Sequence, residues 1–377
     1  MDRRIYFFAN FGNWDKLPLG GGEVGNRKTL DLLIKAGFDV IPIPKYKRVK
    51  NHSFINCILL LWRVFKNICT YIYILVCGRR CNSIVHIVGF YGNMIYFEAL
   101  LVFIAKILNY KTIYEMRGGG SDSFYYNNSF IYRLFFINTI KKADCIFSQG
   151  KENYLLLHSI KNDCDIFYYP NYVMDDFYPK EYPLKDSSQI NLIYFGRISK
   201  SKNIDLIIDV FKIISQKFDN VYLDIIGNCY EEKYLSIIKK KISQDYLENR
   251  VKLYPACNHE SLKKHLRNKH FYIFPSVEQR EGHSNALTEA MSWGLIPIAT
   301  SHGFNKTVIG NERLCVNQLI VDEFVDIISD IIMNGEMDRL SFEMYERVQN
   351  FYTENKVFYN LKQKYNDLFD SYQNKET

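Results

Sequence analysis

The feature that most constrains the fold is an alternation of short apolar runs with longer stretches of helical periodicity along the whole chain. Strands buried on both faces read as continuous apolar runs, and helical crossovers between them are typical of parallel sheets. The sequence therefore predicts an α/β protein with two successive series of strands. The first series is predicted at 5–9, 38–43, 84–88, 112–115, 145–148 and 166–169, and the second at 191–195, 222–226, 251–254, 271–274 and 296–299.

The stretch 170–189 interrupts this alternation with Pro170, Pro179 and Pro183 among polar residues. Clusters of this composition indicate a connection between elements. A length of 377 residues is also enough for two domains. We expect an N-terminal domain at 1–172, a linker at 173–189, a C-terminal domain at 190–350, and a final helix at 351–377 that packs back toward the N-terminal domain.

The nine cysteines are scattered and are never spaced as Cys-x-x-Cys. This argues against a disulfide framework and a zinc site, and it favours a reducing, cytoplasmic compartment. Met1 is followed almost directly by a strand-like segment, so we expect no signal peptide. No zinc finger, helix-turn-helix or RNA-binding aromatic motif is evident, and nucleic acid is not an expected partner.

The net charge of +7 is divided unequally along the chain. Residues 1–150 hold 20 basic and 9 acidic side chains, a net charge of +11, and the remainder carries −4. No acidic residue occurs between Val40 and Phe97. The basic side chains that we expect on the membrane and acceptor side are Lys45, Lys47, Arg48, Lys50, Arg63 and Lys66.

The same region contains an apolar stretch at 54–77 that is long enough to cross a bilayer. Arg63 and Lys66 lie near its middle, and each would cost about 2.5–3.5 kcal/mol at the bilayer centre. We therefore expect an amphipathic helix that does not span. It either lies on an anionic membrane surface or packs on the core with its charged face in water.

The motif richest in functional residue types occupies 274–297 and reads as a strand, a loop, a helix and a second strand. Ser284 or Asn285 is a suitable N-cap for a helix that ends at Trp293. Gly294 is suited to the left-handed conformation that terminates such a helix.

Two glutamates fall in this motif, Glu281 in the predicted loop and Glu289 in the predicted helix. The loop 282–285 would present backbone N–H groups at a helix start, which is a suitable phosphate site. The functional interpretation is that the two carboxylates bind different parts of one extended ligand. The alternative is a solvated loop residue and a carboxylate stabilised by the helix dipole.

This segment resembles the signature of the retaining GT-B glycosyltransferases of family 4, in which Pro-Ser precedes a glutamate, seven residues, and a second glutamate in a Glu-Ala-Met helix. Further matching motifs follow in the family order: Phe195-Gly196-Arg197 with Lys202, Asp224-Ile-Ile-Gly227, and Val251-Lys-Leu-Tyr254. The resemblance implies the GT-B architecture, with two Rossmann-like α/β/α domains that face each other across a cleft.

The resemblance also implies roles for matching positions. Arg197 and Lys202 match the basic pair that binds the donor diphosphate and neutralises the leaving group. Glu281 matches the carboxylate that faces the donor sugar, and Glu289 matches the one that binds the ribose hydroxyls. Such enzymes are metal-independent, so neither a metal nor a cofactor is expected. The expected donor-binding residues are Gly21, Gly22, Gly196, Arg197, Lys202, Gly227, Tyr254, Glu281, Gly282, His283, Ser284, Asn285 and Glu289.

The segment from Gly20 to Gly25 fits the literal pattern of dinucleotide-binding folds. However, it begins well after the strand that ends at Ala9, and Asp39 begins the next strand instead of ending it, so an oxidoreductase is disfavoured. The resemblance implies instead a loop that approaches the donor phosphates. A plain flexible turn is the alternative.

Arg117 follows a predicted strand and precedes three glycines. Many family members have a histidine there, whereas arginine stays charged and only donates hydrogen bonds. We expect Arg117 either to take part in the reaction by binding an anionic acceptor group or to pair with Asp122. His86 is expected to be a core histidine, and His283 is the better functional candidate.

Taken together, the residues and the resemblance predict a cytoplasmic hexosyltransferase, peripheral on the inner face of the cytoplasmic membrane. It would move a sugar from a nucleotide-sugar, with UDP favoured, to a glycan or lipid-linked oligosaccharide in bacterial capsule, O-antigen or exopolysaccharide synthesis, with retention. Two alternatives stay open. One is a nucleotide-sugar epimerase of the same fold, which needs no acceptor, and the other is a non-catalytic nucleotide-sugar-binding subunit.

Overall fold

The computed structural model describes residues 3–16, 21–46, 54–78, 81–89, 92–186, 188–278 and 280–373. The chain divides into two compact units, which are described separately. Unit 1 comprises Met1–Tyr169 and Phe358–Thr377, and unit 2 comprises Pro170–Val357. Residues 173–189, where a linker was expected, fall in unit 2, and Val173 and Phe177 are buried there.

The sheet of unit 1 has six parallel strands among the described residues, in the order β2-β1-β3-β4-β5-β6. They are β1 (Arg4–Ala9), β2 (Asp39–Pro44), β3 (Ser83–Gly89), β4 (Lys111–Met116), β5 (Cys145–Ser148) and β6 (Ile166–Tyr168). The helices are α1 (Gly21–Lys35), α2 (Phe54–Cys77), α3 (Ile95–Ile107), α4 (Ser121–Tyr126), α5 (Phe130–Lys142), the 3-10 turn η1 (Lys151–Asn153), α6 (Tyr154–Ile160) and most of α14 (Glu354–Gln373).

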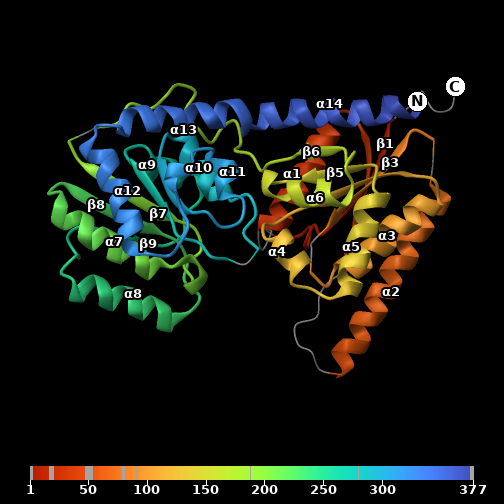
Figure 1. The fold of residues 1–377 in the computed structure, drawn as a ribbon, viewed down its shortest axis with the longest axis horizontal. Helices are drawn as coiled ribbons and strands as arrows, with labels where there is room; N and C mark the ends of the chain where they lie inside the picture. The colour runs from red at the N-terminus through yellow and green to blue at the C-terminus, as the bar shows by residue number, and fades with distance from the viewer. Residues whose placement is uncertain are drawn as a thin grey trace. The chain divides into compact units, whose positions relative to one another are not determined.

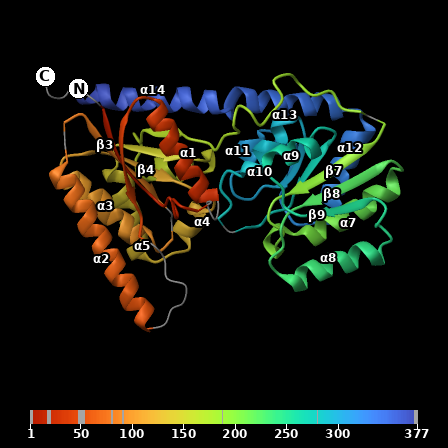
Figure 2. The same ribbon diagram turned by 180° about the vertical axis from the view of Figure 1, so that it is seen from behind.

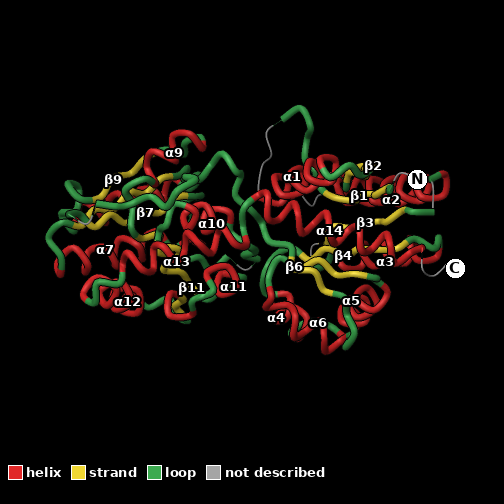
Figure 3. Tube along the Cα trace, turned by 90° about the horizontal axis from the view of Figure 1, so that it is seen from above, coloured by secondary structure: helices red, strands yellow, loops and turns green. Residues whose placement is uncertain are grey.

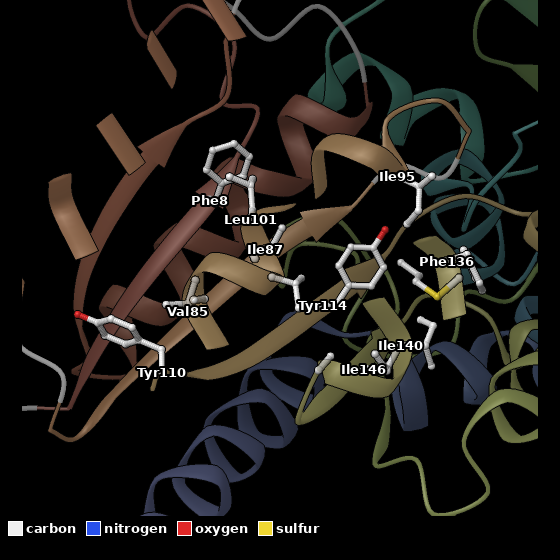
Figure 4. Close-up of a cluster of buried hydrophobic side chains, with 14 of the residues drawn as sticks. Phe8, Val85, Ile87, Ile95, Leu101, Tyr110, Tyr114, Phe136, Ile140 and Ile146 are labelled. Atoms are coloured by element: carbon white, nitrogen blue, oxygen red, sulfur yellow. The ribbon is translucent and has the colours of Figure 1, made fainter. Parts of the chain in front are cut away.

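Helices cover both faces of this sheet. The chain moves along the sheet in one direction from β1 to β2 and in the other from β3 to β6, and right-handed crossovers in opposite directions place their helices on opposite faces. On one face, α2, α3 and α5 lie together (Figures 1 and 2). Their side chains meet alternate residues of β1, β3 and β4, including Phe8, Val85 and Tyr114, in one hydrophobic core (Figure 4). The residues that alternate with these on the same strands point to the other face, where α1 and α14 lie. His86 of β3 therefore meets Tyr365 of α14.

Unit 2 repeats this plan with the strand order β12-β11-β10-β7-β8-β9. The strands are β7 (Ile190–Phe195), β8 (Val221–Ile226), β9 (Val251–Tyr254), β10 (Phe271–Phe274), β11 (Ile296–Thr300) and β12 (Cys315–Val316). The helices are η2 (Lys200–Lys202), α7 (Ile204–Lys217), α8 (Glu232–Gln244), α9 (His259–Leu266), α10 (Asn285–Ser292), α11 (Asn305–Ile309), η3 (Glu312–Leu314), α12 (Val321–Met333) and α13 (Met337–Phe351).

In this unit, α7, α8 and α12 lie on one side of the sheet and α9, α10 and α13 on the other (Figures 1 and 2). Seen from above, the strands of each unit form a layer between helices (Figure 3). Each predicted strand is present with ends within two residues of the prediction, which confirms two Rossmann-like α/β units. The two-residue strand β12 was not predicted.

The apolar stretch 54–77 forms one helix, α2, as expected. Among the described residues it is the one helix long and apolar enough to cross a membrane. Only 11% of its most apolar window is buried, whereas the core helix of a soluble protein would be mostly buried. Tyr71 and Leu75 are its buried residues, and they pack into the unit 1 core.

Candidate functional site

The predicted donor-binding residues of unit 2 gather at the carboxyl edge of its sheet. Arg197 follows β7, Gly227 follows β8, Tyr254 ends β9, and Glu281 lies in the loop after β10. Because β10, β7, β8 and β9 are adjacent and parallel, these positions share one edge. Ligands of open α/β sheets bind outside this edge.

Lys202 and Glu281 form a mostly buried ion pair at this edge. The side chain of each is 11% exposed, and Ser276 joins the two. Lys202 Nζ donates to Ser276 Oγ at 3.0 Å, and the Ser276 hydroxyl donates to Glu281. A cation and a carboxylate are thus fixed next to each other at the start of the loop, where an anionic ligand would compete for the cation.

Arg197 is more exposed than Lys202 and reaches the same loop from β7. Its side chain is 57% exposed, and its Nη2 lies 3.2 Å from Glu278 Oε2. The Ser201 hydroxyl donates to the same oxygen at 2.7 Å. Arg197 is therefore held by one surface ion pair, which is weak enough to exchange for a ligand phosphate.

Glu278 and Ser276 were not predicted as site residues, although both belong to the Pro-Ser motif. Gly303 was also missed. A Cβ on it would lie 2.3 Å from the carbonyl oxygen of Glu281, so only glycine permits this approach. The sequence signal for Ser276 and Glu278 was their place in the loop after an apolar strand, whereas nothing local pointed to Gly303.

Helix α10 begins where the sequence predicted. Ser284 is its N-cap and accepts a hydrogen bond from Leu287 N at 3.4 Å. Glu289 lies inside the helix with its side chain 16% exposed, and its Oε1 is 3.7 Å from Nε2 of His259. His259 in turn packs edge-on against Phe177. The residues Gly282 and Asn285 flank the helix start, next to Glu281.

The ring of His283 points into unit 2 and holds the loop in place. Its Nε2 lies 2.6 Å from Thr288 Oγ1, and its ring packs against Tyr352 with centroids 5.0 Å apart. Its carbonyl oxygen accepts a hydrogen bond from Asn171 at 2.7 Å. Burial, assisted by the charge of Arg347, lowers the pKa of His283 to about 3, so the ring is neutral. These contacts favour loop anchoring over direct contact of the ring with a donor.

The glycines of the two neighbouring strand ends pack closely. A Cβ on Gly227 would lie 1.9 Å from the carbonyl oxygen of Gly196, so this crossing of β7 and β8 ends requires glycine. Tyr254, at the end of the adjacent strand, packs edge-on against His265 with centroids 4.8 Å apart.

In unit 1, Arg117 lies in a buried polar network. Its guanidinium pairs with Glu115 and donates to Thr29 Oγ1 at 3.1 Å, and the arginine is only 6% exposed. Thr29 Oγ1 is 2.9 Å from the hydroxyl of Tyr169. The expected pairing with Asp122 is thus replaced by pairing with Glu115, which stands two positions earlier on the same strand face. The balanced charge favours a structural role for Arg117 over binding of an acceptor anion.

The same network contains His86, which is a core histidine as expected. Its Nδ1 lies 2.5 Å from the Tyr365 hydroxyl, and its Nε2 lies 3.0 Å from Glu115 Oε2 without regular hydrogen-bond geometry. Burial lowers the pKa of His86. Burial alone would raise the pKa of Glu115, but Arg117 and His86 outweigh it and lower that pKa to about 2.

The remaining predicted residues of unit 1 are less informative. Gly21 and Gly22 open α1, and a Cβ on either would meet no atom within 4 Å. Lys45 is mostly buried beside Glu98, with its Nζ 3.3 Å from Oε1, so a carboxylate balances its charge. Arg63 and Lys66 lie on α2. Three further predicted cations, Lys47, Arg48 and Lys50, lie outside the described residues, as does Gly20.

No group of three or more His, Cys, Asp or Glu side chains within the described ranges could hold a metal ion. The one Asp-x-Asp sequence, Asp163–Asp165, precedes β6 in unit 1, where Asp165 pairs with Lys364 at 2.6 Å. It therefore belongs to a different unit from the residues expected to bind the diphosphate. All nine cysteines are free thiols.

Comparison with known proteins gives one family and a common fold. Residues 178–367, half of the chain, match the model of the family described as glycosyl transferases group 1. An uncharacterized glycosyltransferase of Bacillus subtilis, YqgM, is 25% identical over 150 residues, which are 39% of this chain and 40% of that protein's length.

Solved structures resemble nearly the whole chain. A sucrose-phosphate synthase from Thermosynechococcus elongatus has a TM-score of 0.72 at 15% identity, covering 98% of this chain and 100% of that one. Anabaena HepE in complex with UDP has a TM-score of 0.68 at 12% identity, covering 97% and 100%. A glycosyltransferase from Rickettsia africae has a TM-score of 0.69 at 14% identity, covering 97% and 98%. At these identities the likeness establishes the GT-B type of fold.

Proposed function

We propose that this chain, which belongs to the glycosyl transferases group 1 family, transfers a hexose from a UDP-sugar to a glycan or lipid-linked oligosaccharide with retention of configuration. We place this reaction in bacterial polysaccharide synthesis, on the cytoplasmic face of the membrane. The observation that carries the proposal is the cluster of Arg197, Lys202 and Glu281 beside the N-terminus of α10.

The cluster supplies what departure of a nucleoside diphosphate requires. Arg197 is exposed and weakly paired, so it is able to turn toward a phosphate, and Lys202 adds a second cation. Backbone N–H groups at the start of α10 favour negative charge at the same edge. These groups stabilise the charge that develops on the leaving diphosphate without a metal ion.

Two carboxylates complete the proposed donor site. We assign Glu281 to the donor sugar, because its pairing with Lys202 places it next to the proposed phosphate position. We assign Glu289 to the ribose hydroxyls, because carboxylates accept hydrogen bonds from hydroxyl groups and this one lies within α10. The UDP found in the HepE structure supports a uridine nucleotide as the first donor to test.

The first prediction concerns Arg197. We expect Arg197→Ala to lower kcat/KM for transfer from a UDP-sugar by about a hundredfold or more, because it removes charge stabilisation of the leaving group. Radiolabelled sugar transfer to a lipid-linked acceptor measures this. A matched control is Arg339→Ala, which removes an arginine 60% exposed that pairs with Glu336 on the surface of α13, and it should leave transfer unchanged.

Unchanged transfer by Arg197→Ala would reject the assignment of this site. Incubation with the donor alone separates the other functions. A new sugar nucleotide formed without acceptor would indicate an epimerase, and tight donor binding without transfer to any acceptor would indicate a binding subunit.

A further inference from the structure

Helix α2 carries a second apolar stripe that faces away from the unit 1 core. Phe54, Ile58, Leu61, Phe65, Ile72 and Val76 recur at helical spacing and are 81%, 53%, 70%, 58%, 37% and 50% exposed. Trp62, at 61% exposure, borders the stripe. The buried residues Tyr71 and Leu75 belong to a different side of the helix. An amphipathic helix on a protein core needs only one apolar stripe, so the second is unexplained by folding.

The two helices next to α2 extend this apolar surface. On α3, Leu100, Phe103 and Ile107 are 39%, 45% and 61% exposed. On α5, the exposed apolar residues are Phe130, Ile131, Leu134 and Phe135. These three helices lie side by side (Figures 1 and 2), and their exposed apolar residues are called the α2–α3–α5 surface below. A surface of this extent on one face marks an interaction site.

The exposed charges on these helices have one sign. Neither α2 nor α5 contains an acidic residue. The only acidic residue of α3 is Glu98, which is fully buried and bonded to Lys45 and Tyr114. Lys66 on α2 and Lys141 and Lys142 at the end of α5 are exposed. The surface is therefore apolar with a basic margin, which is complementary to an anionic lipid headgroup layer above hydrocarbon.

The C-terminal half of α2 is part of the fold and does not leave it. Tyr71 donates through its hydroxyl to Leu101 O at 3.1 Å, and the Tyr110 hydroxyl donates to Leu75 O at 2.7 Å. Crossing a bilayer would break both bonds and expose two core residues. By contrast, the N-terminal half of α2 extends beyond α3 and α5 (Figures 1 and 2). The N-terminal half is thus placed to enter the headgroup region of a bilayer, while the C-terminal half of α2 stays packed on unit 1.

We propose that the α2–α3–α5 surface docks unit 1 on an anionic lipid bilayer, with the N-terminal half of α2 inserted in the interface. This inference rests on the proposed function, which includes a lipid-linked acceptor, and adds the surface that would attach the enzyme to the membrane. It assigns this attachment to apolar side chains as well as to basic ones. It does not depend on which sugar is transferred.

The test uses the full chain and vesicles of phosphatidylglycerol mixed with phosphatidylcholine. We expect co-flotation with these vesicles, a blue shift of Trp62 fluorescence that Trp62→Phe abolishes, and substantial binding that persists in high salt. Leu61→Gln with Phe65→Gln should weaken binding about tenfold or more, because both side chains lose their hydrocarbon environment. Both residues are exposed, so the melting temperature should not change.

A matched control changes apolar residues of similar exposure in unit 2. Ile237 and Met333 are 51% and 67% exposed, and Ile237→Gln with Met333→Gln should bind vesicles as the unaltered chain does. Vesicle binding by Leu61→Gln with Phe65→Gln equal to that of the unaltered chain would overturn the proposal. Loss of all vesicle binding in high salt would also overturn it. So would a dimer of the unaltered chain, seen by sedimentation, that Leu61→Gln with Phe65→Gln abolishes. Binding of UDP-sugar without vesicles is measured separately, so failure here leaves the donor site unaffected.

Discussion

At the scale of single residues, the two units use charge differently. In unit 1, Arg117, Glu115 and His86 balance one another inside the protein, and their polar atoms are almost inaccessible to solvent. In unit 2, the Lys202–Glu281 pair is mostly buried, whereas Arg197 and its partner Glu278 are exposed, at 57% and 37%. A buried and balanced group mainly orders the fold, whereas an exposed pair such as Arg197 with Glu278 is able to exchange partners with a ligand.

Buried histidines make stability depend on pH. Burial lowers the pKa of His283 to about 3 and that of His270 to about 4, below the ordinary value of 6.5. The unfolded chain therefore binds more protons, so stability is fully present above pH 6.5 and falls as the pH drops below it. We expect His283→Gln to reduce the slope of this loss by up to about 1.4 kcal/mol per pH unit. Urea unfolding at pH 7, 6 and 5 measures it.

The control for this experiment is Thr288→Val, which removes the hydroxyl at 2.6 Å from His283 Nε2 but keeps the imidazole. It should lower stability at every pH and keep the slope. Parallel curves for His283→Gln and the unaltered chain would show that the histidine is not responsible.

At the scale of elements, local signals predicted the ends of α10, because Ser284 supplied the cap and Gly294 the stop with φ +67°. The pairing of Arg117 was predictable in principle, since Glu115 stands at the spacing that shares a strand face. The proximity of His86 to Tyr365 was not, because it joins positions 279 residues apart and depends on where α14 packs. The strand β12 was too short for any apolar pattern to indicate.

Helix α14 is tied to the unit 1 sheet by its polar contacts as well as its apolar ones. The Tyr365 hydroxyl is fully buried beside His86 Nδ1, so Tyr365→Phe leaves a buried nitrogen without its partner. We expect a loss of about 1–3 kcal/mol in the free energy of unfolding, measured by chemical denaturation. Tyr359→Phe, on the same helix but 66% exposed, is the control and should change nothing. Equal stability of both variants would contradict a structural role for the hydroxyl.

At the scale of the whole molecule, the sequence predicted two α/β units, because each unit repeats the same alternation of apolar strands and helices. A final helix that packs toward the N-terminal domain was expected at 351–377, and residues 358–373 fold with unit 1. The place of residues 173–189 was not foreseen, because they were expected to be a linker and instead belong to unit 2. Such membership depends on long-range packing, which no local pattern of residues encodes.

This division predicts how the protein melts. Each unit has its own sheet and core, so we expect two calorimetric transitions. The proposed donor residues Arg197, Lys202, Glu281 and Glu289 all belong to unit 2. A UDP-sugar at 100 times its dissociation constant adds about 2.7 kcal/mol to the state that binds it, so one transition should rise by about 5–10 °C. Tyr365→Phe should lower the other transition and thereby identify it as unit 1. A rise of only the transition that Tyr365→Phe lowers would place donor binding outside the cluster of Arg197, Lys202 and Glu281.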